Sequence, residues 1–304
     1  MNNLIHITDV GAPAGNGADS TERIRKQYAR LGISSHIITA GHSPLHVAFT
    51  ACTDVSLEAR KNVAKVLGSL GIREPALLPT ALNSAPRNAT ESQANGQEDY
   101  IYRVKSDNKT DETLLIYGPE VLRWVVAFRG RKGLTVEKIL KIFDVIPDTS
   151  NGSQFRSAEH LPIAHFLEAK GKLNERSERQ PVELDEISDI SPSKDNIVVV
   201  PPDEYGNGRI LVKWDTFGEI LTRPSIRIPR ISEQILAVRK SLTEVIPNEL
   251  SVWPSSNHFT GETLKVLNIG TRWNVGLTTT TNGDVIELSK NLSSKVGESY
   301  RVET

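Results

Sequence analysis

The residues best suited to bind a ligand follow the first apolar run of the sequence. Residues 4–8 form a β-rich run, Asp9 comes directly after it, and a glycine-rich loop over 11–17 follows. Because ligands of open α/β sheets bind beyond the carboxyl ends of the strands, a carboxylate at this position can accept hydrogen bonds from both hydroxyls of a ribose. Alternatively, Asp9 only caps the next turn. The loop matches neither G-x-G-x-x-G nor the Gly-Lys-Ser/Thr of a P-loop, which favours a surface loop over a phosphate site.

The other residues that could do chemistry lack the spacing that metal binding or hydrolysis needs. His42 and His46 are predicted to lie in a loop because Gly41 and Pro44 flank them, His160 and His165 are out of phase on a predicted helix, and no carboxylate cluster accompanies either pair. The single cysteine, Cys52, excludes CxxC-type sites. The sequence also contains no G-x-S-x-G nucleophile elbow. We therefore expect neither a metal site nor an α/β-hydrolase triad.

Composition narrows the class of protein further. A length of 304 residues predicts about two domains. With 36 basic and 37 acidic residues, the chain lacks the basic excess of a nucleic-acid binder. No apolar run reaches the ~18 residues of a membrane span, and the N-terminus does not resemble a signal peptide. We expect a cytoplasmic protein whose partners include neither nucleic acid nor membrane.

The elements that must position Asp9 alternate between strand and helix patterns in the first half of the chain. Strand-like runs occur at 4–8, 35–39, 100–104 and 113–117, and helix-like segments at 21–31, 56–70, 119–128 and 161–170. This order predicts an α/β N-terminal domain with a mainly parallel sheet over residues 1–180.

The second half of the chain has a different character. A polar, acidic stretch with two prolines predicts a linker at 181–196. Strand-like runs then follow between turn signals, at 197–200, 209–214, 264–267, 285–288 and 300–302. They predict a smaller, mainly antiparallel β domain over 197–304. One helix is predicted within 232–245, because Ile235, Val238 and Leu242 would share one helical face.

Five segments match, in order, the motifs of one enzyme family. They are Thr8–Gly11, Ile37–Ser43, Phe155–Gly171, Val212–Thr222, and Thr281–Leu288 with Val296–Glu298. They are similar to the family's [TS]-D-[FL]-G, second strand with a [TC]-H turn, F-x-[SG]-R-[DE] with its apolar helix, I-D-x-F-G-N-x-x-T-N, and N-S-x-G-x-L-E-I with V-G-D. The chain thus resembles the S-adenosylmethionine-dependent fluorinase, chlorinase and hydroxide adenosyltransferase family over nearly its whole length.

This resemblance implies a fold, an assembly and a reaction. It implies an α/β N-terminal and a β-rich C-terminal domain, in a homotrimer that binds its small-molecule substrate between domains of neighbouring subunits. The substrate would be S-adenosylmethionine, with no further cofactor and no metal. A nucleophile would attack its 5′-carbon as methionine leaves, so the site must desolvate the nucleophile and align it with the C–S bond.

The resemblance also assigns roles to particular residues. Asp9 would hold the ribose hydroxyls, and Ser157 would be the catalytic residue beside the nucleophile. Phe217 would wall the nucleoside pocket, and Asn282 would face the methionine end. Asp19 would match the carboxylate that binds the ammonium group of the substrate.

Departures from the family pattern leave two functions open. Glu219 stands at the asparagine of F-G-N and Arg223 at the second asparagine, Arg156 replaces a histidine, and the aspartate-bearing V-D-P-G-V-G element is missing. The chain is either an adenosyl-transferring enzyme that uses halide, water or another nucleophile, or a fold relative that binds or transforms a different ligand. Glu219 discriminates between them: paired with Arg223 outside the pocket it would permit adenosyl binding, whereas projecting into the pocket it would indicate another ligand.

Overall fold

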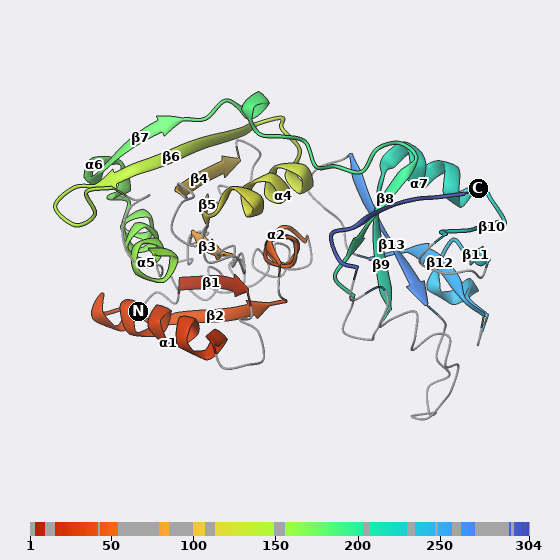
Figure 1. The fold of residues 1–304 in the computed structure, drawn as a ribbon, viewed down its shortest axis with the longest axis horizontal. Helices are drawn as coiled ribbons and strands as arrows, with labels where there is room; N and C mark the ends of the chain where they lie inside the picture. Colours follow the sequence, from red (N-terminus) through yellow and green to blue (C-terminus); the bar gives the residue numbers. More distant parts are fainter. Residues whose placement is uncertain are drawn as a thin grey trace, which may run out of the picture. The chain divides into compact units, whose positions relative to one another are not determined.

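The chain folds into two compact units, each built around one sheet (Figure 1). The first unit comprises residues 1–52, 56–127 and 131–189, and the second comprises 53–55, 128–130 and 190–304. The computed structural model describes residues 4–9, 16–41, 43–53, 79–84, 100–106, 113–148, 156–202, 207–229, 235–246, 249–256, 263–270, 292 and 295–303.

The sheet of the first unit is mixed. Its strands are β1 (Leu4–Asp9), β2 (Ser35–Ala40), β3 (Thr80–Asn83), β4 (Ile101–Ser106), β5 (Thr113–Tyr117), β6 (Leu134–Ile142) and β7 (Ser177–Pro181). They lie in the order β2-β1-β3-β5-β4-β6-β7. The pairs among β2, β1, β3 and β5 are parallel, and the pairs from β5 through β4 and β6 to β7 are antiparallel. The sheet is therefore only half parallel, because β4 returns to β5 through a loop too short for a parallel crossover.

Helices flank this sheet in the first unit. They are α1 (Asn16–Arg30), α2 (Pro44–Cys52), α4 (Pro119–Arg129), α5 (Arg156–Ala169) and α6 (Leu173–Arg176), with a 3₁₀ turn η1 (Leu184–Glu186). Helix α1 buries Ile24 and Tyr28 completely and ends at Gly32, whose φ of 68° suits a helix-terminating glycine. Helix α5 begins five residues before the predicted 161–170, and it tolerates Pro162 within its length.

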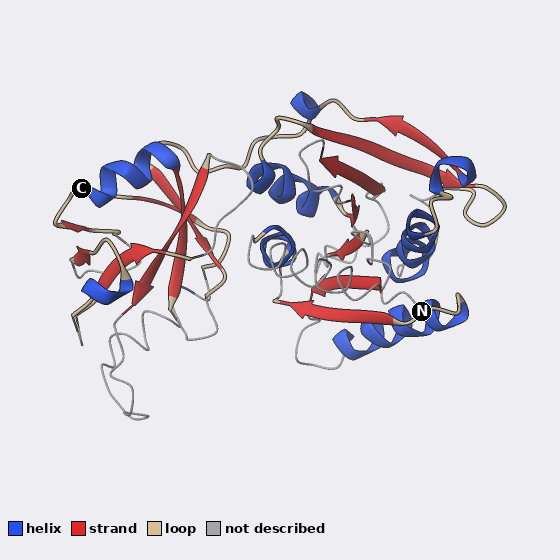
Figure 2. Cartoon of the chain, turned by 180° about the vertical axis from the view of Figure 1, so that it is seen from behind, coloured by secondary structure: helices blue, strands red, loops and turns tan. Residues whose placement is uncertain are grey.

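The order of the first three strands reverses at β1. The chain runs from β1 to β2 on one side of β1 and then to β3 on the other side, with all three strands parallel (Figure 2). Since parallel crossovers are right-handed, the connection from β1 to β2 and the connection from β2 to β3 cross opposite faces of the sheet. Ligands of open α/β sheets bind beyond the carboxyl ends of the strands where the strand order reverses in this way.

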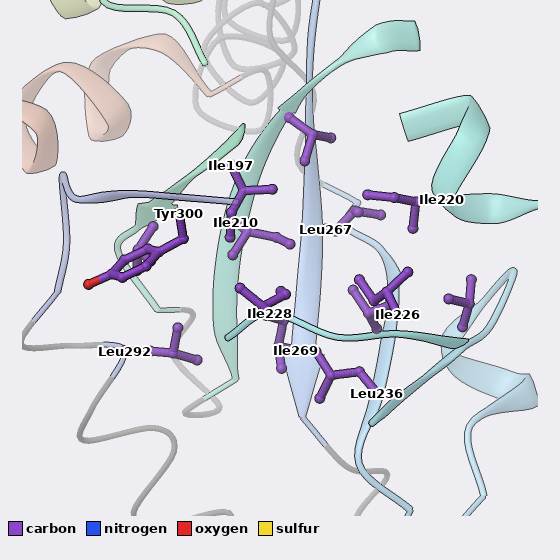
Figure 3. Close-up of a cluster of buried hydrophobic side chains, with 14 residues drawn as sticks. Ile197, Ile210, Ile220, Ile226, Ile228, Leu236, Leu267, Ile269, Leu292 and Tyr300 are labelled. Atoms are coloured by element: carbon purple, nitrogen blue, oxygen red, sulfur yellow. The ribbon is translucent and has the colours of Figure 1, made fainter. Parts of the chain in front are cut away.

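The second unit holds a mostly antiparallel sheet. Its strands are β8 (Asn196–Val200), β9 (Gly208–Lys213), β10 (Ser225–Ile226), β11 (Leu236–Val238), β12 (Ser251–Pro254), β13 (Leu264–Gly270) and β14 (Ser299–Arg301). In the order β10-β11-β12-β13-β9-β8-β14, β11 and β12 form the parallel pair. Alternate residues such as Ile197, Ile210 and Leu267 point into one buried core, together with Ile220 of helix α7 (Trp214–Leu221) (Figure 3).

The predicted helix at 232–245 is wrong. Leu236 and Val238 are buried on one face of strand β11, and Leu242–Glu244 forms a single 3₁₀ turn, η2. Ile235 and Leu242, expected on the buried helical face, are 58% and 50% exposed. Pairing of β11 with β10 and β12 thus outweighs the local helical spacing. The predicted helix at 56–70 and strand at 285–288 lie outside the described residues.

In the part of the chain that the structure describes, no helix combines the length and apolar character needed to cross a membrane.

Candidate functional site

Three polar side chains meet at the carboxyl ends of β1 and β3. Thr8 lies opposite Asn83 in the parallel register, and both are buried, while Asp9 is half-buried at the end of β1. The Thr8 hydroxyl donates to Asp9 Oδ1 at 3.4 Å, and Asn83 Nδ2 donates to Thr8 Oγ1 at 3.4 Å. The sequence-predicted ligand carboxylate, Asp9, therefore lies at the carboxyl end of β1 and is hydrogen-bonded to Thr8, which Asn83 supports in turn.

A second polar group lies deeper on the same face of β1. The Tyr28 hydroxyl is 3.0 Å from His6 Nδ1 and 2.6 Å from His165 Nδ1, and His165 Nε2 bonds to the carbonyl oxygen of Pro79. Because a carbonyl only accepts, His165 carries its proton on Nε2 and accepts from Tyr28 at Nδ1. Tyr28 then accepts from His6 Nδ1. The three hydrogen bonds therefore run in one direction, from His6 through Tyr28 and His165 to the carbonyl of Pro79.

Burial keeps the side chains of His6, Tyr28 and His165 uncharged. Burial lowers the pKa of His6 to about 3, with a smaller contribution from His165 nearby. Burial likewise lowers the pKa of His165 to about 4, against the opposing effect of its bond to Pro79. Burial raises the pKa of the Tyr28 hydroxyl well above its ordinary value. These three side chains therefore supply fixed hydrogen-bond dipoles and no charge at neutral pH.

His46, predicted to lie in a loop, lies instead in the first turn of helix α2, close to the end of β2, because Pro44 opens the helix. His46 Nδ1 is 2.7 Å from Ser43 Oγ, which also accepts from the His46 backbone N–H and so caps helix α2. A side chain at Gly41 would overlap the His46 ring. We predict that Gly41→Ala displaces the ring and destabilises the protein by about 1–3 kcal/mol. Thermal unfolding would measure this, with Gly218→Ala as the control because its Cβ meets nothing. Equal transition temperatures for both variants would contradict the close contact.

Ser157 lies in the first turn of α5, in a different neighbourhood from Asp9. It is buried, and the adjacent Ala158 belongs to a core cluster with Leu4, Ile24 and Tyr28. Leu4 begins β1, whereas Asp9 ends that strand, about 17 Å away at ~3.3 Å per residue.

Two further predicted site residues lie on helix α7 of the second unit. Phe217 stacks on Trp214 with ring centroids 5.6 Å apart, and Lys265 Nζ lies 4.6 Å from the centroid of the Trp214 ring. The Glu219 carboxylate is 3.4 Å from Lys194 Nζ, and both side chains are exposed. Glu219 thus pairs with Lys194 at the surface of this unit instead of with Arg223.

The remaining predicted site residues lie at the limits of the described structure. The backbone of Asp19 is in the first turns of α1, and its side chain lies outside the described residues, as does that of Arg156. Asn282 also falls outside them. Among the residues that the structure does describe, no three His, Cys, Asp or Glu side chains gather as metal ligands.

The sequence pattern does not group the polar residues that meet on β1, β3, α1 and α5, which are Thr8, Asn83, His6, Tyr28 and His165. A partial signal is present, because His6 and Thr8 interrupt an apolar strand at alternate positions, and Tyr28 occupies the buried stripe of α1. Their meeting depends on contacts across up to 137 positions of sequence. Periodicity within one element cannot reveal such contacts.

Comparison with known proteins establishes the fold alone. Neither a family model nor a curated protein matches the sequence. Among solved structures, the chain is similar to an uncharacterized conserved protein from Thermotoga maritima, with a TM-score of 0.56 and 18% sequence identity. The match covers 99% of this chain and 100% of that one. The two-unit architecture is therefore shared along the entire length of both proteins.

Proposed function

We propose that the protein binds S-adenosylmethionine at the carboxyl ends of β1 and β3 and transfers its adenosyl group to a small nucleophile, releasing methionine. The observation that carries this proposal is the position of Asp9 at the strand crossover, oriented by Thr8 and backed by Asn83. A carboxylate held there can accept both hydroxyls of a ribose, and the motif resemblance supplies the adenosyl substrate.

The chemistry suits a site with few ionisable groups. A sulfonium leaves as neutral methionine, so the reaction needs alignment and desolvation of the nucleophile more than a general acid. The nearby His6 and His165 are buried and neutral, which agrees with a positioning role. Ser157 remains the proposed residue beside the nucleophile.

A second candidate is binding of an adenosine-like ligand without substitution. The placement of Ser157 next to Ala158, which packs with Leu4 from the opposite end of β1, favours this alternative. Glu219 pairs with Lys194 at the surface of the second unit, so neither charged group lies in a pocket of that unit. This pairing is compatible with both functions.

Asp9→Ala tests the proposed site. We expect the variant to form methionine and 5′-substituted adenosine at least about tenfold more slowly at low substrate concentration, because it loses charge-assisted hydrogen bonds to the ribose. Chromatography after incubation with S-adenosylmethionine and candidate nucleophiles measures both products. Asp185→Ala is the control, because this carboxylate is fully exposed on η1.

The products separate the two candidates. Methionine release by the wild type and the control, with slow release by Asp9→Ala, would support substitution at this site. Equal rates in Asp9→Ala and the wild type would contradict the proposed location. Binding without any methionine release would favour the second candidate.

A further inference from the structure

Two buried acceptor atoms on the neighbouring strands β1 and β3 have no hydrogen-bond partner among the described residues. They are Asn83 Oδ1 and His6 Nε2, and their residues are 3% and 0% exposed. Natural proteins satisfy nearly all buried polar atoms, so an unsatisfied pair on adjacent strands calls for a physical reason.

The surrounding hydrogen bonds determine which atoms stay unpaired. Because Thr8 gives its proton to Asp9, its oxygen must accept from the Asn83 amide, which places the Nδ2 donor on Thr8 and leaves Oδ1 open. Because His6 donates from Nδ1 to Tyr28, its Nε2 carries a lone pair. Both open atoms are therefore acceptors.

The two acceptors share a face of the sheet. His6 and Thr8 are two positions apart on β1, about 7 Å, and they lie opposite Ala81 and Asn83 of β3. Asp9 adds a carboxylate at the same strand end. We use the name acceptor array for Asp9, Asn83 Oδ1 and His6 Nε2. It presents acceptor atoms only, so it attracts hydroxyl and amino groups and disfavours anions.

We infer that the acceptor array recognises the donor groups of a ribose, with Asp9 accepting the proton of one hydroxyl and Asn83 Oδ1 accepting the proton of the other. Asn83 is thus a further binding residue, and its unpaired oxygen is reserved for the ligand. This inference rests on the proposed function, because it assumes that the ligand carries an adenosyl group.

Titration of Asn83→Leu with adenosine and its 2′-deoxy and 3′-deoxy forms tests the contact. In the wild type, we expect one deoxy form to bind about tenfold more weakly than adenosine, because it leaves Asn83 Oδ1 unpaired. In Asn83→Leu, adenosine should bind about as weakly as that deoxy form, and the difference between the two should fall below about twofold. An undiminished difference in the variant would overturn the inference.

Thermal unfolding with and without adenosine provides a second readout. Asn83→Leu loses the hydrogen bond from Nδ2 to Thr8 as well as the open acceptor, so its unfolding temperature without ligand serves only to show that the variant folds. We expect saturating adenosine to raise the unfolding temperature of the wild type by more than that of the variant. Equal rises in the two folded proteins would overturn the inference.

Asn268→Leu is the matched control. Asn268 also has a buried, unpartnered Oδ1, but it lies on β13 of the second unit. We expect its replacement to leave adenosine affinity unchanged. Adenosine binding by the wild type that Asn83→Leu does not weaken would overturn this inference and leave the proposed function standing. Failure of the wild type to bind either S-adenosylmethionine or adenosine would overturn both.

Discussion

Lowering the pH from 7 to 4 is expected to destabilise the protein by about 3 kcal/mol for each of His6 and His165. The pKa values of these buried histidines are about 3 and about 4 in the folded chain, below the 6.5 of an unperturbed histidine. Between pH 6.5 and about 4 the unfolded chain therefore binds more protons than the folded chain. Stability is complete above pH 6.5 and is lost as the pH falls through this window.

The loss has a clear structural cause. A proton on His165 would occupy Nδ1, the atom that accepts from the Tyr28 hydroxyl, and would place a charge in a fully buried position. A loss of several kcal/mol is a large part of the 5–15 kcal/mol typical of a folded domain. Acid unfolding of the first unit should follow.

His165→Gln provides the test of this first prediction. Urea unfolding followed by circular dichroism at several pH values gives the slope of the unfolding free energy against pH. We expect the slope between pH 4 and 6.5 to fall by about 1.4 kcal/mol per pH unit in the variant, because one titrating group is lost. His36→Gln, at an exposed position of β2, is the control. An unchanged slope in His165→Gln would show that the histidine does not titrate as its burial requires.

Arg103→Met is expected to lower the unfolding free energy by about 3 kcal/mol, because it leaves the buried Glu168 carboxylate with only the more distant ammonium of Lys105, 3.9 Å away. Arg103 on β4 contacts Glu168 of α5 through Nε at 3.1 Å and Nη2 at 2.7 Å, and their side chains are 5% and 10% exposed. Its Nη1 donates to Glu137 of β6 at 3.0 Å and to Asn174 of α6 at 2.7 Å. One guanidinium thus joins two strands and two helices.

A surface pair and a double variant complete this second test. Arg176→Met breaks the exposed pair with Asp144, and we expect it to cost at most about 1 kcal/mol. Arg103→Met combined with Glu168→Leu should recover part of the loss, since a buried ion pair can be exchanged for apolar side chains at little cost. Chemical unfolding of the four proteins measures this. A loss in Arg103→Met no larger than in Arg176→Met would contradict the importance of the buried network.

Much of the fold could be predicted where periodicity is local. The strand at 35–39 appears as β2, the helix at 119–128 as α4, and the strand at 264–267 within β13. Strand β7 was not predicted, because its sequence Ser-Glu-Arg-Gln-Pro is polar and joins the sheet at its edge by pairing with β6. Edge strands gain their hydrogen bonds from distant partners, which local composition does not report.

The candidate site was predicted in part. Asp9 could be selected because it directly follows a predicted strand, and ligands of open α/β sheets bind beyond the carboxyl ends of strands. Asn83 could not be selected, because its role depends on the order β2-β1-β3, which sets it opposite Thr8. The histidines were expected not to bind a metal. The buried hydrogen bonds that join His6 and His165 through Tyr28 could not be predicted, because they depend on how α1 and α5 pack on β1.

Isothermal titration of the wild-type protein with S-adenosylmethionine tests the central claim most directly. We predict saturable heat with one ligand per subunit, and a markedly weaker isotherm for Asp9→Ala. Absence of heat from the folded wild-type protein, at concentrations that saturate adenosyl-binding enzymes, would contradict the proposed site and its adenosyl ligand.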